Sequence, residues 1–197
     1  MLCDAGIPRF EGEEPHAAYA YRRVAVTSTG LPLATSLSKR KEAVVKKWFD
    51  RMVQEYPGTA TRFLTQEKDP FRNPVGHTLK ESLSALFEAL IQPKNGGFPE
   101  PVLEDIVKIR AVQDFSAAQA VSFPFLLKRI LREELEADIP RYPDAFAGLE
   151  ARIDDLALLA FDLYVKCRER IFEIKFNEAK RSTFLLEKMH QRGQSGL

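Results

Sequence analysis

Glycine is nearly absent from the second half of this chain. Of ten glycines among 197 residues, only Gly148 lies between Phe98 and Arg192. Because Gly and Pro are the residues that most readily interrupt regular backbone, this stretch predicts long helices. The last of them, expected from about residue 149 or already from Asp144, meets no further breaker before Gly193. A helix of about 40 residues is about 60 Å long, so it must bend or project from a compact body.

The first half shows apolar residues at helical spacing. A helix is expected from Ser36 or Ser38, either of which is a good N-cap, to Tyr56, where a Pro-Gly pair ends it. A short turn of helix is expected around residues 59–64. One face of the first helix carries Val45, Trp48, Phe49, Met52, Val53 and Tyr56.

Capping boxes and prolines predict where the middle helices begin. The box at residues 78–81 predicts one helix start, and a following helix is expected to start at Pro99 or Pro101. The box at residues 116–119 predicts a helix that runs to about residue 138. Pro124 lies inside that helix and should kink it.

Residues 1–35 differ in composition from the rest of the chain. They contain three prolines and a Thr-Ser-Thr-Gly run, without a sustained apolar period. We expect a mobile or loosely docked leader there, followed by one all-helical domain at residues 36–190 whose last helix projects. The fold class is therefore predicted as all-α, a single bundle of about five principal helices with a long C-terminal helix.

Composition argues against several classes of function. The 29 Lys and Arg against 28 Asp and Glu leave a net charge of +1, so no overall field attracts nucleic acid or anionic lipid. Cys3 and Cys167 are too few for a disulfide framework and suit a reducing compartment. Asp162 interrupts the longest apolar run before it reaches the ~20 residues of a membrane span. We expect a cytoplasmic protein without a membrane span or a nucleic-acid partner.

The chain shows no pattern typical of a catalytic or metal site. His16, His77 and His190 are far apart in the sequence and lack partners at metal-ligand spacing. Glu187 and His190 form one Glu-x-x-His element, whereas a di-iron bundle needs two such elements and two further glutamates. Phosphate-binding, dinucleotide-binding and nucleophile-elbow motifs are absent from the sequence. We expect no cofactor and no enzymatic activity.

The end of the last helix predicts a contact with another protein. Residues 165–192 contain eight Lys or Arg and four Glu, too sparse a basic pattern for nucleic acid. The same segment keeps apolar residues that would be costly to leave exposed, which favours self-association or a partner. The predicted contact residues, in a likely homodimeric arrangement, are Ile171, Ile174, Phe184 and Leu185.

Polar residues interrupt two otherwise apolar helical segments. We expect them to form an internal network in which Arg110 or Arg152 pairs with an aspartate and fixes how the helices meet. The alternative is a pocket for an anion or polar ligand lined by the arginines. The residues concerned are Arg110, Gln113, Asp114, Arg152, Asp154 and Asp162.

Several separated blocks together resemble the RsbRD N-terminal domain family, which is named for co-antagonists of the RsbT kinase in bacterial stress signalling. The resemblance covers about residues 36–182. The blocks are FRNPVGHTL at residues 71–79, IRAVQDFS at 109–116 with QAVSF at 119–123, and ID at 153–154 with LAFDLY at 159–164 and KCR at 166–168.

This resemblance implies an all-helical, globin-like or related sensory domain without enzymatic activity of its own. Co-antagonists usually carry a phospho-accepting STAS output domain after it, so the resemblance implies that another signalling protein supplies the output. We therefore expect a non-catalytic signalling module that works by protein–protein interaction. The alternative is a helical small-molecule carrier or sensor whose apolar pocket is lined by Trp48, His77, Phe87, Phe123 and Phe161.

Overall fold

A computed structural model describes residues 31–67, 69–92, 97–113 and 115–194. All regular structure in these ranges is helical, which confirms the all-α fold class. The expected leader at residues 1–30 lies outside the described residues. The helices are α1 (Leu31–Val53), α2 (Gly58–Gln66), α3 (Pro74–Ile91), α4 (Glu100–Ala111), α5 (Ala117–Ala120), α6 (Phe123–Glu134) and α7 (Pro143–Gln194), with a 3-10 turn at Ile139–Arg141 before α7.

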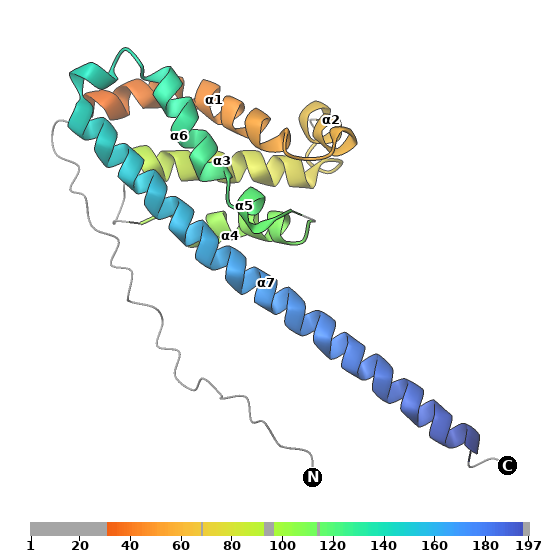
Figure 1. The fold of residues 1–197 in the computed structure, drawn as a ribbon. Helices are drawn as coiled ribbons and strands as arrows, with labels where there is room; N and C mark the ends of the chain where they lie inside the picture. Colours follow the sequence, from red (N-terminus) through yellow and green to blue (C-terminus); the bar gives the residue numbers. More distant parts are fainter. Residues whose placement is uncertain (1–30, 68, 93–96, 114, 195–197) are drawn as a thin grey trace, which may run out of the picture.

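The body of the protein is a bundle built around α1, α3, α6 and the first half of α7. Helix α1 packs against α3 and α6, while α7 packs against α4 and α6 and more lightly against α3 (Figure 1). Trp48 and Phe123 stack in the middle of this bundle, with their ring centroids 6.2 Å apart. The Trp48 indole also donates a 2.7 Å hydrogen bond to the Phe123 carbonyl, so the core is joined by polar as well as apolar contacts.

Two helices begin earlier than the sequence predicts. Helix α1 starts at Leu31 rather than at Ser36, because Leu33 and Leu37 are buried and extend its apolar face. Helix α3 starts at Pro74 rather than at the box of residues 78–81. Asn73 caps it by accepting a hydrogen bond from the Gly76 amide. A side chain outside the expected box therefore sets the start of α3.

The helix expected at residues 116–138 is two helices, so the prediction of one kinked helix is wrong. The capping box at Ser116 is confirmed, but α5 ends at Ala120, and Pro124 lies in the first turn of α6. Proline has no N–H to give to the Ala120 carbonyl. That carbonyl instead accepts a 2.9 Å hydrogen bond from the Arg110 guanidinium, so a side chain replaces the missing helical bond.

Helix α7 extends well beyond the rest of the protein (Figure 1). Its 52 residues correspond to about 78 Å at ~1.5 Å per residue. Ile171 is the last residue described as partly buried against the core, and residues 172–184 are all exposed. Roughly the second half of the helix therefore stands clear of the body.

Candidate functional site on the last helix

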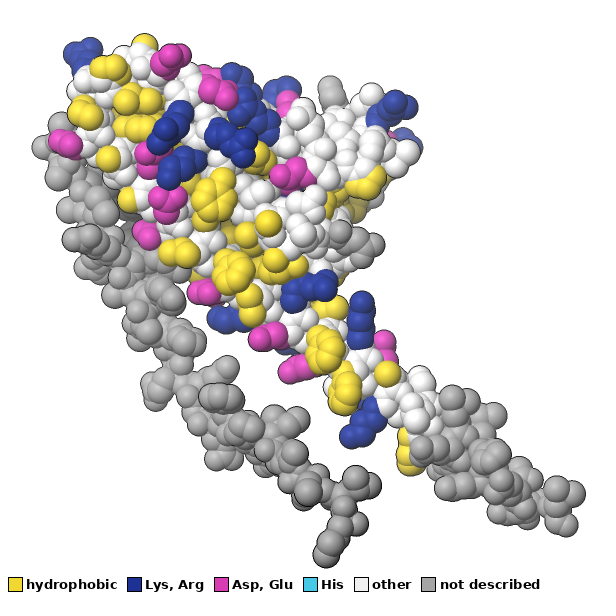
Figure 2. Space-filling model, in the orientation of Figure 1, with side chains coloured by type: hydrophobic (Ala, Val, Ile, Leu, Met, Phe, Trp, Pro, Cys, Tyr) yellow, Lys and Arg dark blue, Asp and Glu magenta, His cyan; other side chains and the backbone are white. Residues whose placement is uncertain are grey.

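Large apolar side chains are exposed along one side of α7, and we call them the apolar stripe. They are spaced so that all five point within about 60° of one another around the helix axis, given ~100° per residue. Three lie beside the body and two lie on the projecting half, so the stripe runs across the boundary between them (Figure 2). The stripe consists of Leu158, Phe161, Val165, Phe172 and Phe176.

The most exposed part of the stripe is on the projecting half. Phe172 and Phe176 are 70% and 58% exposed, and their rings stack with centroids 6.4 Å apart. A ring pair that is one helical turn apart presents a continuous aromatic surface to solvent. This arrangement suits contact with another apolar surface.

The predicted contact residues lie in several environments. Ile171 packs partly against the body, and Ile174 is exposed but points to the side of α7 opposite the stripe. Phe184 is exposed, and the Leu185 side chain lies outside the described residues. Sequence reasoning located the exposed segment but missed Phe172 and Phe176 as its main surface. Their four-residue spacing, continued back to Val165, was the available signal.

Arg110 is the centre of a buried polar network. Its side chain is fully buried and forms an ion pair with Glu55 of α1. Ser122 donates a 2.8 Å hydrogen bond to the same carboxylate, and the Arg110 guanidinium lies 4.7 Å from the Phe115 ring centroid. Arg110 thus joins α1, α4 and α5. The expected partner Asp114 lies outside the described residues, and sequence reasoning missed Glu55 because its alternation with apolar neighbours is typical of any amphipathic helix.

Two groups beside this network affect its titration. Burial raises the pKa of the Tyr56 hydroxyl, while the Arg110 charge opposes that rise. The Tyr56 hydroxyl oxygen, Arg110 Nη1 and Gln113 Oε1 are buried without a hydrogen-bond partner. These polar atoms lie at the junction where α4 gives way to α5, so the junction is held by charge and aromatic contacts as much as by apolar packing.

The other predicted network residues lie apart from Arg110. Arg152 donates a 2.7 Å hydrogen bond to the Ala89 carbonyl at the end of α3, and burial lowers its pKa. Asp154 pairs at 2.9 Å with Lys128 of α6, while Asp162 is exposed on α7. The arginines therefore tie different helix ends together.

The five residues proposed for an apolar pocket occupy two environments. Trp48, Phe87 and Phe123 are fully buried within the core. His77 is about half exposed and pairs at 3.1 Å with Glu81, and Phe161 belongs to the apolar stripe. None of the five lines the groove described next.

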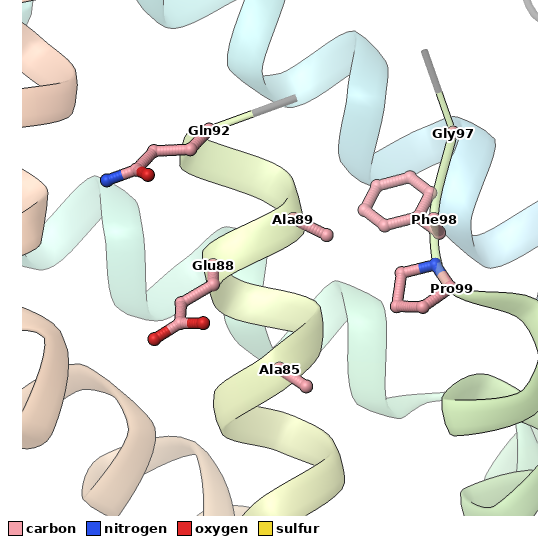
Figure 3. Close-up of a pocket in the computed structure, with 7 residues that line it drawn as sticks. All are labelled: Ala85, Glu88, Ala89, Gln92, Gly97, Phe98 and Pro99. Carbon is pink, nitrogen blue, oxygen red and sulfur yellow. The ribbon is translucent and has the colours of Figure 1, made fainter. Parts of the chain in front are cut away.

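A groove of about 460 Å³ lies beside the C-terminal end of α3. Figure 3 shows Ala85 and Ala89 directed across it toward Phe98 and Pro99. Glu88 points to the other side of α3, where it pairs with Lys41. The groove thus offers small apolar contacts and no convergent titratable groups.

Cys167 has the properties of a structural thiol. It lies in a hollow of about 670 Å³ between α4 and α7 that is lined mainly by charged side chains. Burial raises the pKa of its thiol, and nearby Glu104 adds to that rise. A raised pKa keeps the thiol protonated and poorly nucleophilic at neutral pH.

Two searches of the described residues found no further site. Within these ranges, no three His, Cys, Asp or Glu side chains converge in an arrangement that could hold a metal ion. Every helix of the same part of the chain falls short of the length and apolar character that crossing a membrane requires.

An all-α body with a long projecting helix and an exposed apolar surface is the form of a helical interaction domain. The family model described as the RsbT co-antagonist protein rsbRD N-terminal domain matches residues 42–177, and this chain belongs to that family. Membership implies a regulatory domain of stress signalling. No curated protein matches the chain, and no solved structure matches it.

Proposed function

We propose that this chain is a cytoplasmic, non-catalytic regulatory module of bacterial stress signalling that acts by protein–protein interaction. We propose further that it associates with a second copy of itself through the projecting half of α7. The observation that carries this proposal is the exposure of Phe172 and Phe176 on a helix beyond the body. Exposed aromatic surface of this kind is unfavourable in water and is typical of interaction sites.

Truncation of the projecting helix tests the proposal. A chain that ends after Ile171 keeps the α7 residues that pack against the core and loses both phenylalanines. Sedimentation velocity should show a dimer for the full chain and a monomer for the truncated chain. Thermal unfolding of the body should remain cooperative, because the removed residues make no core contacts in the described part of α7.

Point variants separate loss of the surface from loss of the helix. Phe172→Ser with Phe176→Ser should weaken self-association at least tenfold, since two aromatic contacts are removed at once. Phe63→Ser is the matched control, because Phe63 is also half exposed but lies on α2. A full chain that sediments as a monomer, or a double variant that associates as tightly as the parent, contradicts the proposal.

A further inference from the structure

We infer that the two copies meet with their α7 helices parallel and their apolar stripes face to face, so that both bodies lie at the same end of the pair. This inference rests on the proposed function, because it assumes that the second copy is the occupant of the stripe. It adds the direction of pairing and extends the contact from the projecting helix onto the body.

The extent of the stripe shows why a contact limited to the helix tip is insufficient. Leu158 and Phe161 belong to the stripe, yet they lie on the first half of α7 beside the body. Lys128 pairs with Asp154 and Arg132 pairs with Glu150, so α6 runs antiparallel to α7. Continuing that register places the exposed Phe125 beside residues 157–158 and widens the apolar surface there.

The area of the stripe is adequate for a specific pairing. A fully buried aromatic side chain covers about 150–250 Å², so the exposed parts of the five stripe residues amount to roughly 500 Å² per copy. Two copies together would bury roughly 1,000 Å² of apolar surface before flanking side chains are added. This value approaches the ~1,200–2,000 Å² of stable interfaces.

The charges on the two edges of the stripe indicate the direction of pairing. Arg168 and Lys175 follow one edge, whereas Asp162, Glu169 and Glu173 follow the other. In a parallel pair each basic edge faces the partner's acidic edge, whereas in an antiparallel pair each edge faces its own counterpart. Antiparallel pairing would therefore set basic against basic and acidic against acidic.

Two further residues bear on this charge argument. Lys180 continues the acidic edge with a positive charge, so the complementarity is confined to the part of the helix before it. Arg168 also donates a 3.1 Å hydrogen bond to the Ala111 carbonyl at the end of α4. That bond uses one of its five N–H groups and anchors the guanidinium near the level of the facing glutamates.

Single-cysteine crosslinking tests the direction. In a background with Cys3→Ser and Cys167→Ser, one variant carries Val165→Cys and another carries Ala179→Cys. Both positions point into the stripe sector, are 14 residues apart along the helix, and tolerate the small change in volume. In a parallel pair each position faces itself, so both variants should form a disulfide-linked dimer under mild oxidation.

The outcomes distinguish this inference from the proposed function. In an antiparallel pair only one of the two positions can lie at the symmetry axis, since they are ~21 Å apart along α7. Crosslinking of one variant or neither, in chains that sediment as dimers, overturns the parallel pairing and leaves the proposed function standing. A parent chain that is monomeric overturns both. Glu178→Cys, which points away from the stripe, is the control that should not crosslink.

Salt provides an independent measure of the same arrangement. If opposite edges meet, the dissociation constant should rise several-fold between 0.05 and 0.5 M NaCl, because salt screens the attraction. If like edges meet, salt should instead tighten the pair. A dissociation constant that falls with added salt contradicts the parallel arrangement.

Discussion

The contact between Asn73 and Gly76 allows a quantitative test of how α3 begins. Asn73 is buried, and its side-chain amide donates to the carbonyls of Leu64 and Glu67 at 3.1 and 3.0 Å. Its oxygen accepts from the Gly76 amide at 2.9 Å. A Cβ added at Gly76 would lie 2.7 Å from that oxygen, closer than side-chain atoms approach one another.

Gly76→Ala should therefore destabilise the protein although it replaces glycine by a better helix former. The new methyl group displaces the Asn73 side chain and disrupts three hydrogen bonds of about 1 kcal/mol each. Alanine in a helix recovers about 1 kcal/mol relative to glycine. The net expectation is a loss of about 2 kcal/mol in the free energy of unfolding.

The sign should reverse when Asn73 is replaced first. Asn73→Ala alone loses the same three bonds and costs about 3 kcal/mol, but it also removes the atoms that the methyl group would meet. In that background Gly76→Ala should stabilise by up to about 1 kcal/mol. The coupling energy between the two substitutions is then about 3 kcal/mol.

Urea unfolding of the four proteins at one temperature measures this cycle. Equal slopes with denaturant concentration would show that the denatured state is unchanged, so the midpoints can be compared directly. Gly76→Ala costing the same in both backgrounds, within about 0.5 kcal/mol, would refute the argument that Asn73 is what excludes a side chain at this position.

Three further predictions concern the body of the protein. Glu55→Gln should lower the free energy of unfolding by about 2–4 kcal/mol, because it leaves the buried Arg110 charge without its counter-ion, whereas the exposed-site control Glu81→Gln should change it by less than about 0.5 kcal/mol; both are measured by urea unfolding. In the parent protein stability should fall as pH rises above 10, since the unfolded tyrosine loses its proton before the buried Tyr56, whose pKa is raised from 10.0. Tyr56→Phe should reduce that fall between pH 9 and pH 11, and an unchanged slope counts against it. Pro124→Ala should shift the thermal midpoint only slightly, as expected for the first turn of a helix; a gain of about 3 kcal/mol would instead indicate a proline inside one.

The resemblance found in the sequence located the family, and the blocks that carry it now have physical roles. The Asn and Gly of FRNPVGHTL form the cap of α3, and the Arg of IRAVQDFS forms the buried pair with Glu55. The Ser116 capping box was legible because its two hydrogen bonds lie within four residues. Local features of this kind could be predicted, since sequence spacing alone determines them.

The candidate interaction surface was predicted only in outline. Low glycine content and an apolar segment near the C-terminus indicated a long helix with an exposed contact region. Which residues face solvent depends on where the body packs against α7, and that direction is set by the Arg168 bond to α4 and the Asp154 pair with α6. Both partners are distant in the sequence, so Ile174 and Phe172 could not be distinguished beforehand.

The sequence by itself determined the all-α class, the long final helix and the family, because helical spacing, few backbone breakers and ordered motif blocks are all local properties of the chain. The tertiary structure decided the break before Pro124, the pairing of Arg110 with Glu55, and the line of Leu158, Phe161, Val165, Phe172 and Phe176 on the surface. Each of these depends on which segments meet in space. A donor 14 residues upstream replaces the amide that Pro124 lacks, a carboxylate from α1 neutralises a charge on α4, and the position of the body leaves one side of α7 uncovered.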